Sequence, residues 1–235
     1  MAGFTDIHTH FVYGVDDGAR TAQDMRAMLD EAHAQGVAAI FGTSHAEPGM
    51  KPFDYETYQA HLEEARQYCD EMGYDMTLCS GAELLYTPAM DAWIQERKLI
   101  TLGDTNRVLV EFVPDVEGRE MELMLDMMAD RGYRPILAHI ERYECMKGAF
   151  PFRLKEQYDV QFQVNCRTVV ETTGFFRRRK LNQWLKSGII DYVATDMHNM
   201  TSRPPMMRKA YEELRKQYGR AYAESLTNAS AFYNG

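Results

Sequence analysis

Short apolar runs alternate with longer helical segments along almost the whole chain, and this alternation limits the fold more than any single motif. Seven runs have the character of buried strands: Thr5–His10, Val37–Thr43, Met76–Ser80, Val108–Phe112, Pro135–Ala138, Val160–Val164 and Tyr192–Thr195. The helical segments between and after them are Thr21–Gln35, Tyr55–Met72, Thr87–Lys98, Glu117–Arg131, Arg177–Ser187 and Arg203–Tyr218. The first two helices are expected to start at caps on Thr21 and Asp54 and to stop at Gly36 and Gly73. This order predicts parallel β-α units, closed as a barrel or open as a doubly wound sheet.

Polar side chains follow these strands at their carboxyl ends. In chain order they are His8, His10, His45, Glu83, Glu111, His139, Asn165, Asp196 and His198. Successive ends lie about 30 residues apart, the length of one β-α unit. Barrel active sites are built at this edge, whereas a two-sided open sheet would not bring all seven ends around one cup. We therefore predict a seven-stranded α/β barrel, with residues 1–235 forming a single domain.

Composition narrows the classes of function. The chain has 235 residues and a formal net charge of −9, which disfavours nucleic acid as a partner. No stretch reaches the roughly 18 apolar residues that a membrane span needs, so no membrane insertion is expected. The four cysteines form no pairing motif and no Cys-x5-Arg phosphatase loop, which indicates reduced thiols in a cytoplasmic protein.

The polar strand ends predict a metal centre. His8 and His10, and likewise Asp196 and His198, are two residues apart and would project from the same face of a strand. Singly, a residue such as Glu111 or His139 is more often a structural group, and His33 and His61 are expected to be ordinary surface histidines. Together, the eight His, Glu and Asp side chains exceed what one ion needs, so two or three divalent ions are expected. Phosphoester hydrolysis is the leading reaction class, and amide hydrolysis competes with it.

Two arginines and two aspartates lie close to these ligands. Arg142 and Arg203 are expected to bind phosphate, and a salt bridge to a neighbouring carboxylate is the alternative. Asp17 is a candidate metal ligand or proton donor, although Asp-Asp-Gly is also a turn sequence. Asp16 fits the turn interpretation better.

At these residues the chain resembles the polymerase-and-histidinol-phosphatase (PHP) superfamily, and within it the CpsB/CapC-type protein-tyrosine phosphatases of bacteria. The motifs appear in the family's order, as Asp6-Ile-His-Thr-His10, Gly14-Val-Asp-Asp-Gly18, Thr43-Ser-His45, Gly81-Ala-Glu83, Leu109-Val-Glu111-Phe112, His139-Ile-Glu-Arg142, Thr195-Asp-Met-His-Asn199 and Thr201-Ser-Arg203. They span nearly the whole chain.

The resemblance implies a distorted seven-stranded barrel with a metal cluster, usually manganese, with iron, zinc and magnesium as alternatives. It implies that metal-activated hydroxide, not cysteine, attacks phosphotyrosine. By position, the metal-site residues are His8, His10, Asp17, His45, Glu83, Glu111, His139, Asp196 and His198, and Arg142 and Arg203 bind phosphate. The implied substrate is the tail of a bacterial tyrosine kinase that controls capsule or exopolysaccharide synthesis.

Three features leave the substrate open. Ala46 stands where family members often carry a second histidine, and Ile140 where they often carry proline. The basic stretch Gly174–Lys180 either guides an acidic phosphopeptide or is simply a solvated helix start. Histidinol phosphate or another small phosphate ester on the same scaffold is the alternative substrate, and a non-catalytic metal-binding regulatory module is the second alternative.

Overall fold

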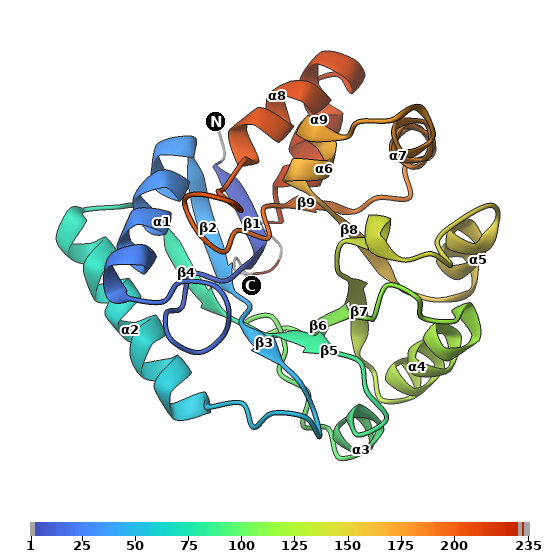
Figure 1. The fold of residues 1–235 in the computed structure, drawn as a ribbon, viewed down its shortest axis with the longest axis horizontal. Coiled ribbons are helices and arrows are strands. Elements are labelled where there is room, and N and C mark those ends of the chain that lie inside the picture. The colour runs from blue at the N-terminus through green and yellow to red at the C-terminus, as the bar shows by residue number, and fades with distance from the viewer. Residues whose placement is uncertain (1–2, 230–231, 233–235) are drawn as a thin grey trace.

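The structure is a computed structural model that describes residues 3–229 and 232. Its strands are β1 (Phe4–Thr9), β2 (Val37–Gly42), β3 (His45–Ala46), β4 (Thr77–Ser80), β5 (Glu83–Leu85), β6 (Arg107–Glu111), β7 (Arg134–Leu137), β8 (Gln161–Asn165) and β9 (Tyr192–Ala194). Its helices are α1 (Ala22–Gln35), α2 (Tyr55–Met72), α3 (Met90–Gln95), α4 (Gly118–Asp130), the 3₁₀ helix η1 (Ile140–Arg142), α5 (Phe150–Gln157), α6 (Cys166–Glu171), α7 (Phe175–Ser187), α8 (Met207–Tyr218) and α9 (Arg220–Thr227). The strands lie at the centre and the helices surround them (Figure 1).

The strands form two sheets, and neighbouring strands within each sheet are parallel. One has the order β1-β2-β4 and the other the order β3-β5-β6-β7-β8-β9. Only two residues separate β2 from β3, and only two separate β4 from β5, so two chain segments run through both sheets. At the far end, β9 returns to β1: the His10 N–H donates to the Met197 carbonyl and the Asp196 N–H donates to the His8 carbonyl, both at 2.9 Å.

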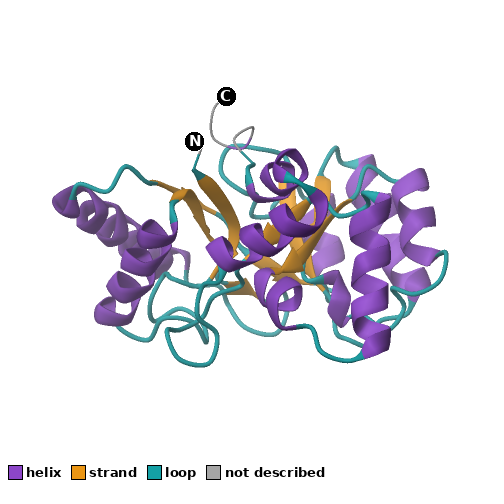
Figure 2. Ribbon diagram, turned by 90° about the horizontal axis from the view of Figure 1, so that it is seen from above, coloured by secondary structure: helices purple, strands orange, loops and turns teal. Residues whose placement is uncertain are grey.

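Two apolar layers use opposite faces of the strands. Leu109 in β6 belongs to a small cluster with Ile7, Phe41 and Ile136, which come from three other strands. Its chain neighbours Val108 and Val110 belong to the larger cluster that includes the buried faces of the helices. Because side chains alternate along a strand, β6 contributes to both layers. Buried polar side chains gather at the strand ends and on one face of β8. Figure 2 shows the strands enclosed between helices on either side.

The seven predicted strands are confirmed to within one residue at each end, together with their parallel arrangement. The short strands β3 and β5 were not predicted. Two helix predictions are wrong in extent: Thr87–Lys98 contains only the six residues of α3, and Arg203–Tyr218 becomes helical only at Met207. Pro204 and Pro205 explain the later start of α8, because proline restricts both its own backbone and that of the residue before it. The short helices α5, α6 and α9 were also not predicted.

The predicted caps of the first two helices are confirmed. Thr21 accepts a hydrogen bond from the Asp24 N–H, and the Asp24 side chain bonds back to the Thr21 N–H, which completes a capping box. Asp54 caps α2 through the Thr57 N–H. Gly36 and Gly73 end these helices in the left-handed conformation that glycine adopts at low cost. None of the helices in the described part of the chain combines the length and apolar character needed to cross a bilayer.

Candidate metal centre

The strand ends bring the predicted ligands to one place. His8 lies in β1, His45 in β3, Glu83 in β5 and Glu111 at the end of β6. The other five follow β1, β7 or β9 in the chain, with Asp17 on the loop that precedes α1. In each of four overlapping groups, ligand atoms lie within 4.8 Å of one another: His10, Asp17, His45 and His198; His8, Glu83 and His139; His8, His10 and Asp196; and His45, Glu83 and Glu111. All nine predicted metal-site residues are therefore in these groups.

Glu83 contacts four of the histidines among the nine. Its Oε2 lies 3.1 Å from His8 Nε2, 3.3 Å from His10 Nε2 and 3.2 Å from His45 Nδ1. Its other oxygen, Oε1, lies 2.8 Å from His139 Nε2. The side chain is almost fully buried, so one carboxylate lies between four imidazoles from three parts of the chain.

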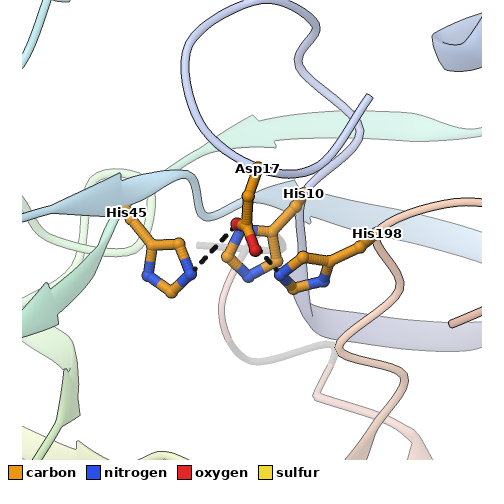
Figure 3. Close-up of side chains that lie close together, drawn as sticks. All are labelled: His10, Asp17, His45 and His198. Atoms are coloured by element: carbon orange, nitrogen blue, oxygen red, sulfur yellow. Dashed lines mark ion pairs between the residues drawn. The ribbon is translucent and has the colours of Figure 1, made fainter. Parts of the chain in front are cut away.

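Asp17 lies between two histidines that are far apart in the sequence. Its Oδ1 lies 3.4 Å from His45 Nε2 and 3.3 Å from His198 Nε2, and the His10 ring lies close beside them (Figure 3). Unlike Glu83, the Asp17 side chain is 67% exposed, so this group lies at the solvent side of the centre.

The two arginines converge on Asp196. Its Oδ2 accepts from Arg142 Nη2 at 2.6 Å, from Arg203 Nη2 at 2.7 Å and from Asn165 Nδ2 at 2.7 Å. Its Oδ1 instead lies 3.5 Å from His8 Nε2 and 3.6 Å from His10 Nε2. The salt-bridge alternative is therefore what this structure shows for both arginines. The same contacts place both guanidinium groups beside the metal centre.

The backbone is strained at two of the ligands. Among the described residues, only three non-glycine residues have positive φ, and two of them are His139 (28°) and Asp196 (51°). Histidine and aspartate visit this region rarely, at a cost of about 1–3 kcal/mol each. Both residues follow the last residues of a strand, β7 or β9, where the turn aims the side chain at the centre.

The donor set fits divalent cations. Ligands about 2.1 Å from an ion lie roughly 3.0–3.4 Å from each other in octahedral or tetrahedral geometry, and the nitrogens around Glu83 Oε2 lie 3.1 to 3.3 Å from it. Glu83 Oε2, Asp196 Oδ1 and His198 Nε2 are buried and make no regular hydrogen bond within the described part of the chain. Such atoms are costly in a folded protein unless another partner, such as a cation, satisfies them.

The ionisation of these groups is shifted by their neighbours. Burial opposes a charge on His10, but the hydrogen bond to Asp16 and the nearby Glu83 carboxylate outweigh it and raise the pKa of His10 to about 10. Burial likewise opposes a charge on His139, whereas Glu111 and Glu83 raise the pKa of His139 to about 9. The neighbouring imidazoles of His198 and His45 hold the pKa of Asp17 well below its usual value. Without a cation, protons on the imidazoles balance the negative charge of the carboxylates. A bound cation would displace these protons.

Asp16 does more than shape a turn, which corrects the interpretation of the sequence. Its Oδ1 accepts the Gly18 N–H at 2.9 Å, as a turn residue would. Its Oδ2, however, lies 2.7 Å from His10 Nδ1 and also accepts the His45 N–H at 3.0 Å. A carboxylate on one imidazole nitrogen orients the ring and leaves the other nitrogen free for a metal.

Gln163 has the same role for His8 and was not predicted. Its Oε1 lies 3.2 Å from His8 Nδ1 and accepts the His139 N–H at 2.7 Å. Its Nε2 donates to Asn165 Oδ1, and Asn165 in turn holds Asp196. The signal was present in β8, where Gln161, Gln163 and Asn165 alternate with Phe162 and Val164 and share one face.

The remaining histidines and the cysteines lie outside the centre. His33 is exposed and stacks on Tyr74. His61 is only half-exposed: its Nδ1 donates to the Tyr13 carbonyl, which corrects its prediction as a plain surface residue. All four cysteines are free. Burial raises the pKa of the Cys69 and Cys79 thiols to about 11, so neither is a ready thiolate nucleophile.

The sequence profile of the CpsB/CapC family, described as capsular polysaccharide synthesis, matches residues 4–232. The chain belongs to this family. The resemblance deduced from the motifs is therefore confirmed. Over 228 residues the chain is 32% identical to the tyrosine-protein phosphatase CpsB of Streptococcus pneumoniae, covering 94% of this chain and 93% of that protein.

Two solved structures show the same kind of fold. One comes from crystal structures of YwqE of Bacillus subtilis and CpsB of Streptococcus pneumoniae, described as metal-dependent tyrosine phosphatases. It matches with a TM-score of 0.84 at 24% identity and covers 93% of this chain and 89% of that one. The other is a histidinol phosphate phosphatase of Lactococcus lactis with zinc, L-histidinol and phosphate, with a TM-score of 0.58, 14% identity and 94% of each chain covered.

Proposed function

We propose that this protein is a metal-dependent phosphotyrosine-protein phosphatase. One observation carries the proposal: nine potential metal-site side chains converge beside Arg142 and Arg203 at the strand ends. The relative at 32% identity is named a tyrosine-protein phosphatase, which supports phosphotyrosine as the substrate class. The physiological substrate that we propose is the tail of a bacterial tyrosine kinase that controls capsule or exopolysaccharide synthesis, in line with the family's description.

The overlapping groups would hold two or three divalent ions, for which we propose manganese. Imidazole and carboxylate donors without thiolates suit manganese, iron or zinc. Glu83 belongs to two of the groups, so its carboxylate would bridge two ions, whereas His10 belongs to another two and would bind one ion through Nε2. Bound ions would neutralise charge on the phosphoryl group and lower the pKa of a coordinated water.

Arg142 and Arg203 would bind the phosphate oxygens. Each is bound to Asp196 through one terminal nitrogen, and a guanidinium group has five N–H donors. Their side chains are 38% and 31% exposed, so a phosphate can reach the remaining donors. Asp196 thereby holds both arginines in position for a planar, bidentate contact.

Asp17 fits the role of metal ligand better than that of proton donor. A general acid must carry a proton near neutral pH, yet His198 and His45 keep the pKa of Asp17 far below that range. Its position at the solvent side of the centre would let it close the coordination of an ion next to the incoming phosphate.

A pocket of about 290 Å³ beside Asp17 and His45 would receive the tyrosine ring. Val15, Pro52 and Phe53 give it apolar walls next to the candidate ligands, and Glu47 and Lys51 line it as well. An aromatic leaving group gains from such walls by burial of its ring faces, whereas a small polar ester gains little. Phosphotyrosine is therefore favoured over histidinol phosphate.

We further propose that the strands close into one distorted seven-stranded barrel, counting β2 with β3 and β4 with β5 as interrupted strands. The hydrogen bonds between the ends of β1 and β9 support this closure. Residues 1–235 would form a single domain, and the free cysteines fit a cytoplasmic location.

A comparison of two substrates tests the proposal. Manganese-loaded protein should show a kcat/KM for a phosphotyrosine peptide at least about tenfold above that for histidinol phosphate. The reason is that histidinol phosphate lacks the contacts of the tyrosine ring with the apolar pocket walls, and such contacts contribute about this factor. Equal or higher efficiency on histidinol phosphate would assign a small-molecule phosphatase instead. No hydrolysis of any aryl phosphate would point to the regulatory module.

A further inference from the structure

The basic stretch at the start of α7 is divided between two faces of the helix. Arg177, Lys180, Leu181 and Trp184 share one face, as spacings of three and four residues require, and line a groove of about 580 Å³. Arg178 and Arg179 line a different groove on the other face. The stretch is therefore more than a solvated helix start, because half of its cations face a defined groove.

This groove begins at the metal centre. Arg142 lines it, and the same Arg142 binds Asp196 at 2.6 Å. Glu141, Thr168 and Thr172 continue the lining from Arg142 toward α7. A peptide whose phosphate lies at Arg142 would thus have this groove directly beside it.

Half of the charged groups that line the groove are already in ion pairs: Arg142 with Asp196, and Arg167 with Glu171. Arg167 is 2.7 Å from Glu171 and also donates to the Ser202 carbonyl. Oε1 of the Glu141 carboxylate accepts from the Asn165 N–H and from the Thr168 hydroxyl, whereas its Oε2 has no hydrogen-bond partner among the described residues, so Glu141 keeps its negative charge in the groove.

Two cations in the groove lack a carboxylate partner among the residues that the structure describes. Lys180 lies over the Trp184 ring at 4.7 Å, and its Nζ donates to a backbone carbonyl, that of Glu141, at 3.4 Å. Arg177 has no ion pair with any described residue, and its side chain is exposed. The groove therefore offers two cationic groups to an incoming anion.

We propose that this groove is a specificity subsite that binds an acidic side chain flanking the phosphotyrosine, with Arg177 and Lys180 as its cationic contacts. This inference rests on the proposed phosphatase activity. The chain as a whole carries a net charge of −9. A local cationic groove therefore distinguishes anionic from neutral peptides, because the rest of the surface repels anions.

The test compares two phosphotyrosine peptides that differ only in the flanking residues, glutamate in one and glutamine in the other. The manganese-loaded protein should hydrolyse the glutamate peptide with the higher kcat/KM, and added salt should reduce the difference. Arg177→Glu should lower the glutamate/glutamine ratio about tenfold, because an exposed pair is lost and a like-charge repulsion replaces it. Arg177→Gln should give a smaller decrease in the same direction.

Arg179→Glu is the matched control, because it makes the same change of charge on the opposite face of α7. The glutamate/glutamine ratio of kcat/KM for this variant should stay at the wild-type value. Two results would overturn the subsite and leave the phosphatase assignment intact. One is an equal fall of the glutamate/glutamine ratio in Arg177→Glu and Arg179→Glu, and the other is a ratio of one for the wild-type protein. If the wild-type protein hydrolysed neither of the two peptides, the phosphatase assignment itself would be overturned.

Discussion

At the scale of single residues, the two oxygens of Asp196 have different partners. Oδ2 receives two guanidinium groups and an amide, whereas Oδ1 faces His8, His10 and His198. One side chain therefore links the candidate metal ligands to the candidate phosphate ligands. Asp196 also has a positive φ, and a strained backbone of this kind persists where the surrounding contacts hold the residue in place.

Asp196→Asn should abolish turnover and preserve the fold. Asparagine has nearly the same volume and tolerates positive φ, but it lacks the charge that a cation and two arginines require. Turnover of an aryl phosphate should fall at least about 100-fold, since several kcal/mol of charge stabilisation are lost. Thermal melting of the metal-free protein checks the fold. Asp191→Asn is the control, since Asp191 binds Lys155 at the amino end of β9. Near wild-type turnover by the Asp196 variant would refute this role.

Gln163→Met should weaken metal binding by about 10- to 100-fold, because outer partners of ligating histidines contribute on this scale. Excess manganese should restore much of the activity, since no ligand is removed. The same substitution at Gln161, whose amide donates to the Tyr192 hydroxyl, is the control. Titration of manganese into both variants measures the effect, and equal affinities would rule out the positioning role of Gln163.

Metal affinity should rise with pH. The pKa of His10 is raised to about 10 and that of His139 to about 9, so both imidazoles are protonated at neutral pH in the metal-free protein. Each must lose its proton to bind a cation, so lowering the pH favours the proton and weakens metal binding, by up to about tenfold per unit for each proton displaced. Calorimetry of manganese binding in buffers of different ionisation enthalpy counts the released protons. Binding without proton release at pH about 7 would contradict these shifts.

At the scale of elements, most strands were predictable because they are short apolar runs, and β2, β6, β7 and β9 contribute side chains to both apolar layers. The candidate ligands were predictable for the same reason, since a polar residue that ends such a run lies at the carboxyl edge that all the parallel strands share. Asp16 and Gln163 were not, because their roles depend on partners brought close only by the fold. His8 and Gln163, for instance, are 155 residues apart in the sequence.

The helix boundaries show where local signals fail. The caps of α1 and α2 were visible as Thr21 and Asp54, whereas α6 has only six residues and no side-chain cap. Helices this short owe their stability to packing against the rest of the protein, so their sequences carry little periodic signal.

Thr21→Ala should lower the free energy of unfolding by about 1 kcal/mol and leave kcat unchanged. The substitution removes the acceptor of the Asp24 N–H and half of the capping box. The cap lies at the amino end of α1, and Thr21 belongs to none of the candidate ligand groups. Urea denaturation measures the stability, and an unchanged midpoint would show that the cap contributes nothing.

At the scale of the whole molecule, the arrangement of charge matters more than its total. The chain is acidic, yet two of its buried carboxylates, Glu83 and Asp196, lie at one edge of the strands together with histidines and two arginines. Buried negative charge without cations would be costly, and protons, arginines or metal ions must balance it. Bound metal ions should therefore both balance this charge and be required for activity.

The most direct test is to strip the protein of metal with a chelator and then add manganese while measuring bound metal and phosphotyrosine-peptide turnover on the same sample. We expect no measurable turnover by the stripped protein and full recovery as two or three manganese ions bind per chain. Full turnover by the metal-free protein would contradict the central claim.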